Sequence, residues 1–322
     1  MKTYVCLIVN VFVVLAVAYG QTSNSKYEVT LFGAPPAGQT VWNLPRSVAV
    51  DAKGTVFLLR ASDPPVLIFN REGKLQKTWG NGLFKEAHSI DLDRDGNLWI
   101  TDREDNMVFK FTVDGKQLLA LGKKGVKGDN TSQDTFNGAS DVAVAANGDF
   151  FVADGQGGNS RVVKFSKEGK FIKIIGGTKG PAPGQFDVPH ALALDSKGRL
   201  LVVDEQPTAH KPRVQIFDQN GTFIEQWADI GLKQPTGIAV TADDTVYIGD
   251  MDGNSVLIVK NGKVLDVIGN VQARPHNVAF DPATGIVYFA DPITPLYAGT
   301  EAIAAGANRA PGGMFKQIIK KK

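Results

Sequence analysis

Pro189-His190-Ala191-Leu192-Ala193-Leu194-Asp195 is one of six similar segments that are spread along the whole chain. Each segment has a variable second position, which is followed by a short alternation of small and branched apolar residues. The second positions recur at intervals of 42, 52, 50, 46 and 40 residues, and they hold Arg46, His88, Ser140, His190, Thr236 and His276. A repeat of about forty to fifty residues is typical of solenoids and β-propellers.

The residues after each segment predict three further strands. A turn with glycine or aspartate, such as Arg94-Asp95-Gly96, leads to a second strand that ends in aspartate in five repeats: Asp102, Asp154, Asp204, Asp250 and Asp291. A third strand, such as Arg161–Phe165, precedes a glycine turn and a fourth strand that closes on glycine, as at Ile175-Gly176. Turn signals every 8–12 residues or so between alternating strands are typical of hairpins. Six repeats of four strands predict an all-β fold, a six-bladed β-propeller.

The two ends of the chain predict how the ring closes. The sixth repeat supplies two strands and, after a loop rich in glycine and alanine, a third strand at Met314–Ile319. It has no fourth strand of its own, whereas Tyr27–Gly33 resembles a fourth strand that has nothing before it. We expect this N-terminal strand to complete the last blade, because the pairing leaves no long sheet edge open.

Residues 1–20 have the pattern of a signal peptide. Lys2 provides the positive start, Val5–Ala18 the apolar run, and Ala18-Tyr19-Gly20 a site of the small-x-small type. A single-pass membrane anchor is the alternative, but an apolar run of 14 residues is shorter than the ~20 that a spanning helix needs. We therefore expect a secreted, periplasmic or otherwise extracellular protein whose mature propeller covers residues 21–322.

The composition limits the function classes. Hydrophobic residues make up 43% and charged residues 21% of the chain, as is usual for a globular protein. The only cysteine is Cys6, which cleavage would remove, so the mature chain is expected to have no disulfide and no thiol nucleophile. A formal net charge of +2 gives no argument for nucleic acid. We expect a monomer without membrane association after cleavage, and a small-molecule or peptide substrate.

The second positions of the repeats suggest a metal site. Three of the four histidines in the chain fall there, in every other repeat, at His88, His190 and His276. The first strand of each propeller blade lines the central axis, and alternate blades are about 120° apart, so the three imidazoles should converge. Three protein nitrogens with one open position are the catalytic zinc arrangement, although copper, nickel and iron also accept imidazole. The alternative is that these histidines are polar residues lining a wet channel.

Arg60 breaks the pattern at the end of the second strand. It occupies the place, fourteen residues after the variable position, where other repeats have aspartate. The aspartates are expected to make turn or blade-to-blade hydrogen bonds. A single guanidinium near a metal is suited to hold a carboxylate or a developing anion, and a structural salt bridge is the alternative.

Several stretches together resemble a known family. The mature chain resembles NHL-type propellers, and specifically peptidyl-α-hydroxyglycine α-amidating lyases, at Leu98-Trp99-Ile100-Thr101-Asp102, Asp141-Val142-Ala143-Val144, Val152-Ala153-Asp154-Gly155, Asn159-Ser160-Arg161, Pro183-Gly184-Gln185-Phe186 and Val188-Pro189-His190. The resemblance implies that His88, His190 and His276 bind zinc and that Arg60 takes part in catalysis. The implied reaction cleaves a carbon–nitrogen bond in a peptidyl-α-hydroxyglycine and gives a peptide amide and glyoxylate.

The chain departs from this family at three positions. Gln156 stands in the place of the catalytic tyrosine, and Glu205 in that of a second active-site arginine. Asn277 replaces a carboxylate that helps to hold a structural calcium. The backbone oxygens of Val48 and Ile90 would remain for a calcium site, but the loss of an anionic ligand weakens it.

The departures change the expected chemistry. Gln156 cannot act as a base near neutral pH, and Glu205 would repel a substrate carboxylate. Glu205 is instead suited to be a general base beside a zinc-bound water, which favours hydrolysis or elimination on an altered small substrate.

Three hypotheses follow for the function. The first is an exported zinc-dependent lyase-like enzyme. The second is a non-catalytic NHL propeller that binds a peptide, glycan or protein partner on its loop face. The third is an elimination enzyme similar to streptogramin lyases, which shares the architecture.

Overall fold

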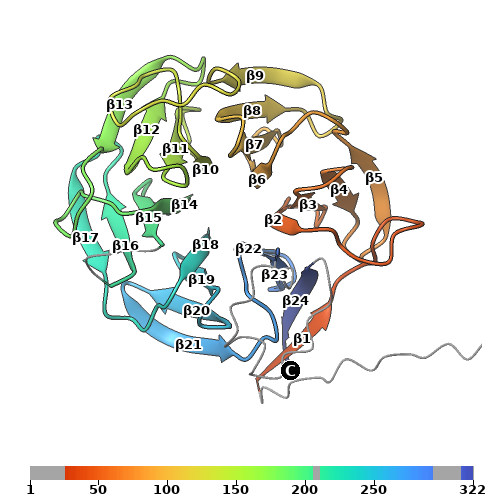
Figure 1. Cartoon of the computed structure of the whole chain (residues 1–322). Coiled ribbons are helices and arrows are strands. Elements are labelled where there is room, and N and C mark those ends of the chain that lie inside the picture. Colours follow the sequence, from red (N-terminus) through yellow and green to blue (C-terminus); the bar gives the residue numbers. More distant parts are fainter. Residues whose placement is uncertain (1–25, 206–210, 293–312, 322) are drawn as a thin grey trace, which may run out of the picture.

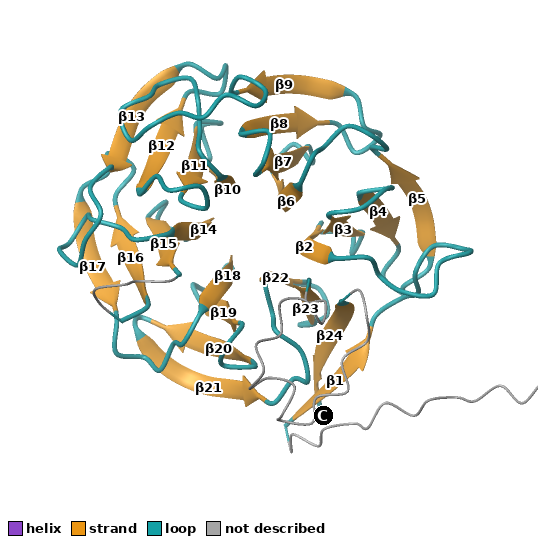
Figure 2. Cartoon of the chain, viewed as in Figure 1, coloured by secondary structure: helices purple, strands orange, loops and turns teal. Residues whose placement is uncertain are grey.

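Six four-stranded antiparallel sheets surround one central axis (Figure 1). The computed structural model describes residues 26–205, 211–292 and 313–321, and within these ranges every regular element is a strand (Figure 2). The predicted signal peptide and His210 lie outside the described residues. Among the described residues, no helix has the length and apolar character that a membrane crossing requires.

Five blades follow the repeats in chain order, from the axis outward. Blade 1 contains β2 (Pro45–Val50), β3 (Val56–Arg60), β4 (Val66–Phe69) and β5 (Leu75–Trp79). Blade 2 contains β6 (Ala87–Leu92), β7 (Leu98–Asp102), β8 (Met107–Phe111) and β9 (Gln117–Leu121). Blade 3 contains β10 (Ala139–Val144), β11 (Phe150–Asp154), β12 (Arg161–Phe165) and β13 (Phe171–Gly176). Blade 4 contains β14 (Pro189–Leu194), β15 (Leu200–Asp204), β16 (Arg213–Phe217) and β17 (Phe223–Trp227). Blade 5 contains β18 (Pro235–Val240), β19 (Val246–Asp250), β20 (Ser255–Lys260) and β21 (Lys263–Gly269).

The sixth blade combines the two ends of the chain. It contains β22 (Asn277–Phe280), β23 (Val287–Asp291), β24 (Met314–Lys320) and, outermost, β1 (Tyr27–Leu31). β1 pairs antiparallel with β24, with Tyr27 opposite Lys320 and Leu31 opposite Lys316. The prediction of a six-bladed propeller closed by its N-terminal strand is therefore confirmed.

A β-bulge at the start of the inner strands of blades 1 to 5 positions the variable residue of the repeat. In blade 4, Pro189 pairs with Asp204 and Ala191 with Val203, so that His190 has no partner in the ladder. The same shift bypasses the variable residues of blades 1, 3 and 5, and in blade 2 it bypasses both His88 and Ser89. A bulge bends the strand and changes the direction of the side chain that it carries. Blades 1 to 5 thus place the variable side chain outside the regular alternation, whereas in blade 6 His276 directly precedes the inner strand β22.

The core lies between neighbouring blades. The interface that closes the ring joins blade 6 to blade 1 through a cluster that includes Phe32, Trp42, Phe69, Tyr288 and Phe315. Phe315 on β24 is fully buried, and its ring lies 5.4 Å from that of Phe32 and 5.6 Å from that of Trp42. Edge-to-face aromatic contacts at these distances add to the burial of apolar surface.

We predict that Phe315→Ala lowers the free energy of unfolding by about 3–5 kcal/mol, because it leaves a cavity at the interface that closes the ring. Urea unfolding followed by tryptophan fluorescence measures this change. Leu118→Ala on the outer strand β9 is the control, since Leu118 is 46% exposed and surface substitutions usually change stability by less than about 0.5 kcal/mol. Equal losses in the two variants would contradict a special role for the closing interface.

Candidate metal centre

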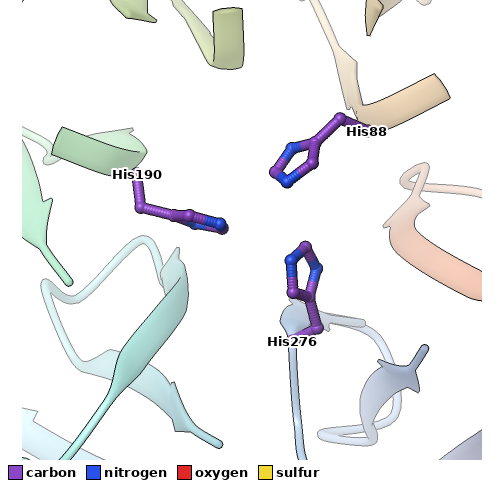
Figure 3. Close-up of side chains that lie close together, drawn as sticks. All are labelled: His88, His190 and His276. Carbon is purple, nitrogen blue, oxygen red and sulfur yellow. The ribbon is translucent and has the colours of Figure 1, made fainter. Parts of the chain in front are cut away.

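The three histidines of the repeat meet on the axis of the propeller. His88 and His190 are the second residues of β6 and β14, and His276 directly precedes β22. Each pair of imidazole rings has centroids 5.0 Å apart, and one ring nitrogen from each histidine lies within 4.8 Å of the other two. Figure 3 shows the three rings pointing toward one region from three sides. The structure therefore brings together the side chains that the sequence placed in one column.

A backbone carbonyl on the next blade orients each ring. The Nδ1 atom of His88 lies 2.8 Å from the oxygen of Ser140, that of His190 2.7 Å from the oxygen of Thr236, and that of His276 2.8 Å from the oxygen of Arg46. A carbonyl oxygen only accepts hydrogen bonds, so Nδ1 must carry the hydrogen and donate it. Nε2 of the neutral ring then has a lone pair available, as in metal-binding histidines that donate their other ring hydrogen to a fixed acceptor.

The electrostatic environment keeps two of these rings neutral. Burial lowers the pKa of His88 well below its usual value, and the charges of His276, His190 and Arg46 lower it further. The pKa of His276 is also lowered well below its usual value by burial, then by His190, Arg46 and Arg103. Neutral imidazole is the form that binds metal, so no proton must be displaced from these two rings near neutral pH.

The space between the rings fits one small ion. A cavity of about 10 Å³ is lined by the three histidines together with Ser89, Ser140, Asp141, Ala191, Thr236 and Asn277, and this is close to the space that one water molecule occupies. Zinc binds imidazole nitrogen at about 2.0–2.1 Å in tetrahedral geometry, so its ligand nitrogens lie about 3.4 Å apart. Nitrogens within 4.8 Å of one another reach that spacing by small side-chain rotations. The three histidines can thus form a metal site, and their donor set fits zinc.

Glu205 and Gln156 lie beside this site, as part of one hydrogen-bonded group. Glu205 follows β15, and its Oε2 atom is 3.7 Å from Nε2 of His190. Gln156 donates a hydrogen bond of 2.8 Å to Oε2 of Glu205, and Gln234 donates one of 2.8 Å to Oε1. The carboxylate of Glu205 is therefore fixed next to the Nε2 atom of His190 by two neutral amides. Their catalytic roles stay predictions.

Arg60 connects two loops. It is fully buried at the end of β3, where its guanidinium donates to the backbone oxygens of Pro64 at 2.7 Å and Asp63 at 2.9 Å. It also donates to Oε1 of Gln39 at 2.6 Å and to the oxygen of Trp42 at 3.3 Å. These contacts fasten the segment before β2 to the loop after β3. A catalytic role of Arg60 stays a prediction, and the residues around the 10 Å³ cavity do not include it.

The three residues predicted for calcium already have hydrogen bonds among neighbouring strands. Oδ1 of Asn277 accepts a hydrogen bond of 3.0 Å from the backbone nitrogen of Val48, and the backbone nitrogen of Ile90 donates to Oγ of Ser47 at 3.1 Å. Asn277 thus joins the inner strands of blades 6 and 1 directly. A calcium ion there stays a prediction.

Sequence reasoning missed a pair of acids in the axial channel. Burial raises the pKa of Asp91 well above its usual value, and the neighbouring Asp141 carboxylate raises it further. Burial also raises the pKa of Asp141. The Oδ2 atom of Asp141 accepts a hydrogen bond of 2.7 Å from the backbone nitrogen of Leu192. Oδ2 of Asp91 and Oδ1 of Asp141 are buried and accept no hydrogen bond within the described part of the chain. The sequence itself marks Asp91 as unusual, because the other five repeats have alanine at the same position: Ala49, Ala143, Ala193, Ala239 and Ala279.

Sequence reasoning also missed the polar side chains that surround the histidines on the loop side of the axis. Arg46 and Arg103 both bind the carboxylate of Glu86. Arg103 continues the chain of contacts through Nη1, which lies 3.4 Å from Oε1 of Gln156. Arg46 occupies the variable position of blade 1, whereas Glu86 and Arg103 belong to blade 2, so the ion pairs join two blades. Arg103 and Glu205 both directly follow the aspartate that ends a second strand, so a shared repeat position was available as a signal.

Comparison with known proteins supports the propeller class. The NHL repeat model matches residues 136–165. NHL repeat-containing protein 3 of Homo sapiens is 28% identical over 270 residues, which cover 76% of this chain and 75% of that protein. The virginiamycin B lyase structure from Staphylococcus aureus has a TM-score of 0.56 and 17% identity, with 82% of each chain covered. A likeness at that identity shows the fold alone.

Two relatives carry the names of amidating enzymes. Peptidyl-glycine alpha-amidating monooxygenase B of Xenopus laevis is 34% identical over 240 residues, which cover 68% of this chain and 26% of that protein. The probable peptidyl-alpha-hydroxyglycine alpha-amidating lyase of Caenorhabditis elegans is 34% identical over 179 residues, which cover 55% of this chain and 48% of that protein. The chain thus spans about a quarter of the length of the first and about half of the second.

Fold, repeat and site together define this protein as a six-bladed NHL-repeat β-propeller with a candidate three-histidine metal centre on its axis. Within that class, its sequence is similar to peptidyl-α-hydroxyglycine α-amidating lyases, which confirms the resemblance predicted from the repeats.

The acid pair leads to a test of stability. The folded-state pKa of Asp91 is raised, so its contribution to stability is greatest at low pH and is lost as the pH rises from about 4 through the folded-state pKa. We predict that Asp91→Asn raises the free energy of unfolding at pH 7 by about 1–3 kcal/mol, because it removes a buried repulsion. Urea unfolding between pH 4 and pH 7 in metal-free buffer measures this. Asp95→Asn, at an exposed turn of the same blade, is the control, and a destabilising Asp91→Asn at pH 7 would contradict the prediction.

Proposed function

We propose that the protein is an exported zinc-dependent lyase-like enzyme that cleaves a carbon–nitrogen bond in a peptidyl-α-hydroxyglycine or a related small substrate. The observation that carries the proposal is the convergence of His88, His190 and His276, each with Nδ1 fixed by a carbonyl. The similarity to proteins named as amidating enzymes supports the reaction class. The signal-peptide pattern at residues 1–20 supports export.

The chain's own residues can perform the proton transfers of this reaction. A bound zinc would supply Lewis-acid polarisation of the substrate hydroxyl. The Glu205 carboxylate lies 3.7 Å from Nε2 of His190, and in this proposal it takes the hydroxyl proton. The carbon–oxygen double bond then forms as the carbon–nitrogen bond breaks, and Glu205 returns the proton to the departing amide nitrogen. The products are a peptide amide and glyoxylate, so atoms and charges balance.

Gln156 and Gln234 position the base in this proposal. Each donates a hydrogen bond of 2.8 Å to a different oxygen of Glu205, which fixes the carboxylate plane. Because neither amide can transfer a proton near neutral pH, they hold Glu205 without competing with it. Gln156 therefore acts through Glu205, where the related enzymes have a tyrosine.

A non-catalytic role is the second candidate. NHL repeat-containing protein 3 covers a similar share of the chain, and its name states no reaction. Such a protein would bind a peptide, glycan or protein on the loop face. Glyoxylate release from a synthetic peptidyl-α-hydroxyglycine, abolished by a chelator and restored by zinc, supports the lyase. Bound zinc without turnover would favour another substrate or the non-catalytic role.

The metal centre gives the first prediction for this function. The purified protein is expected to bind one equivalent of zinc, and His190→Ala to weaken binding by more than about 100-fold, since the loss of an outer-shell partner alone costs about 10–100-fold. Metal analysis and competition with a chelator of known affinity measure both values. His210→Ala is the matched control, because His210 lies off the repeat column. Substoichiometric zinc in wild type, or unchanged affinity in His190→Ala, would rule out the site.

Glu205 gives the second prediction. Glu205→Gln is expected to lower kcat by about 10²–10⁴-fold, the usual contribution of a positioned general base, while the zinc content stays unchanged. Steady-state kinetics of glyoxylate release, together with metal analysis of the same sample, measure this. Glu225→Gln, on the outer strand β17, is the control. Activity that persists in Glu205→Gln with full zinc would remove Glu205 from the mechanism.

A further inference from the structure

Two buried carboxyl groups meet at the boundary between blades 2 and 3. Asp91 lies on β6 and Asp141 on β10, which are neighbouring inner strands (Figure 1). The two side chains are close together, because each carboxyl group shifts the pKa of the other. Asp141 is only 3% exposed, and its Oδ1 atom and Oδ2 of Asp91 have no hydrogen-bond partner among the described residues. A carboxylate has no hydrogen to donate, so the contact between them leaves two buried oxygens unsatisfied.

This pair lies between two cavities on the axis of the propeller. Asp141 is among the residues that line the cavity of about 10 Å³ between the histidines. Asp91 lines a second cavity of about 300 Å³, to which the inner strands of all six blades contribute. Every other residue that lines this second cavity is apolar. Because one water molecule takes up about 30 Å³, the second cavity has room for an ion that keeps several water ligands.

Ser89 supplies a third oxygen at this place. Its hydroxyl lowers the pKa of both Asp91 and Asp141, so it lies within reach of both carboxyl groups. Oγ of Ser89 is also 3.1 Å from Oγ1 of Thr101. Thr101 donates its own hydrogen to the oxygen of Ser140 at 3.3 Å, so it can accept the hydrogen of Ser89. The lone pairs of the Ser89 oxygen are then available to a cation, together with those of the carboxylates.

The donor atoms of this cluster select a different ion from the one that suits the histidines. Two carboxylates and a hydroxyl are hard oxygen ligands, which Ca²⁺ and Mg²⁺ prefer, whereas imidazole suits zinc. Among the largest effects on the pKa of Asp91, none comes from a positively charged group. Two buried carboxylates in contact repel each other, so one of them must hold a proton unless a cation is bound. A divalent cation offsets both charges and gives both unsatisfied oxygens a partner.

We propose that Asp91, Asp141 and Ser89 form a second metal site, which binds one hard divalent cation, Ca²⁺ or Mg²⁺, beside the histidine centre. The cation joins the inner strands of blades 2 and 3. It thereby fixes β6, which carries His88, relative to β10, whose Ser140 carbonyl orients the ring of His88. The second site thus supports the geometry of the first.

The proposed site is separate from the other features of the axis. Its ligands are not the residues Val48, Ile90 and Asn277 that the sequence suggested for calcium, and the Asn277 side chain has no charge to contribute. Oδ1 of Asn277 accepts a hydrogen bond from the backbone nitrogen of Val48 instead. The inference also does not rest on the proposed reaction, because none of its three side chains transfers a proton there.

Calorimetry with the full chain tests the site. The protein is treated with a chelator, dialysed, and titrated with CaCl₂ and, separately, with MgCl₂. Wild type is expected to bind one equivalent of at least one of these ions with a Kd below about 1 mM, the weak end of extracellular calcium sites. Asp91→Ala is expected to weaken this binding at least about tenfold, because an anionic ligand is lost. The fold should tolerate this change, since the other five repeats have alanine at the same position.

A stability measurement on the same samples gives an independent reading. The ion that binds should raise the urea midpoint of wild type, because it binds the folded state and not the unfolded chain. The midpoint of Asp91→Ala should stay unchanged when the ion is added. Asp91→Asn, which keeps the shape of the side chain, should behave in the same way as Asp91→Ala.

Two further variants identify the ligands. Asp95→Asn, at an exposed turn of the same blade, controls for the loss of a negative charge, and Asn277→Ala removes the side chain of the other calcium candidate. Both should bind the ion as wild type does. Wild type that binds neither ion would overturn the site and leave a shared proton between the two acids. Binding that survives in Asp91→Ala, or that is lost only in Asn277→Ala, would also overturn it. Binding that depends on Asp91 in a chain that releases no glyoxylate would sink the reaction and keep this site.

Discussion

The bulge at the start of the inner strands of blades 1 to 5 is the constraint on which the site depends. In a regular strand, neighbouring side chains alternate between the two faces, and each face of a propeller blade packs against the next blade. A residue in the ladder would therefore point into a blade interface. Because the ladder bypasses His88 and His190, their side chains are released from that alternation and extend toward the axis. The same device holds Ser140 and Thr236. Together with His276 at the start of blade 6, the two bypassed histidines can form a metal site.

The bulge also explains how the rings are held. The bypassed residue on the following blade presents its carbonyl to Nδ1, so each even-numbered blade depends on the odd-numbered blade after it. Closure of the ring by β1 and β24 fixes all six inner strands relative to one another, and with them the three nitrogens. Burial disfavours the charged form of His88 and His276 and lowers the pKa of both. With a metal bound, the lone pairs that face one another gain a common partner. The arrangement therefore favours metal binding on electrostatic as well as geometric grounds.

The sequence predicted what repetition encodes. Strand number, blade number, ring closure and the convergence of the histidines all follow from residues that recur at one position of every repeat. The polar group outside the triad follows the repeat only in part, because Arg103 and Glu205 both directly follow the aspartate that ends a second strand, whereas Gln156 lies one residue further on. Arg103, Gln156 and Glu205 lie at the ends of their blades' second strands or just beyond, and their meeting depends on side-chain lengths and rotamers rather than on periodicity. Arg60 shows that a break in the repeat does not by itself identify a functional residue. Its position is unusual for the repeat, but its contacts are with the loops next to its own strand. The sequence shows Asp91 as an acid where the other five repeats have alanine. Only the structure shows that its carboxylate is buried next to Asp141, which raises its pKa.

The changed residues beside the triad are consistent with one another. The resemblance puts Glu205 where the amidating lyases have an arginine, and such a replacement by itself would leave a buried carboxylate 3.7 Å from Nε2 of His190. Here Gln156 and Gln234 satisfy both oxygens of that anion, and Arg103 lies on the other side of Gln156. The resemblance puts Gln156 where the family has a tyrosine, and the structure joins Gln156 to Glu205 by a hydrogen bond of 2.8 Å, so the two departures lie in direct contact. The three histidines keep their Nδ1 atoms fixed by carbonyl oxygens beside this pair. A retained candidate metal centre with changed but mutually hydrogen-bonded neighbours fits an altered substrate better than random loss of the site.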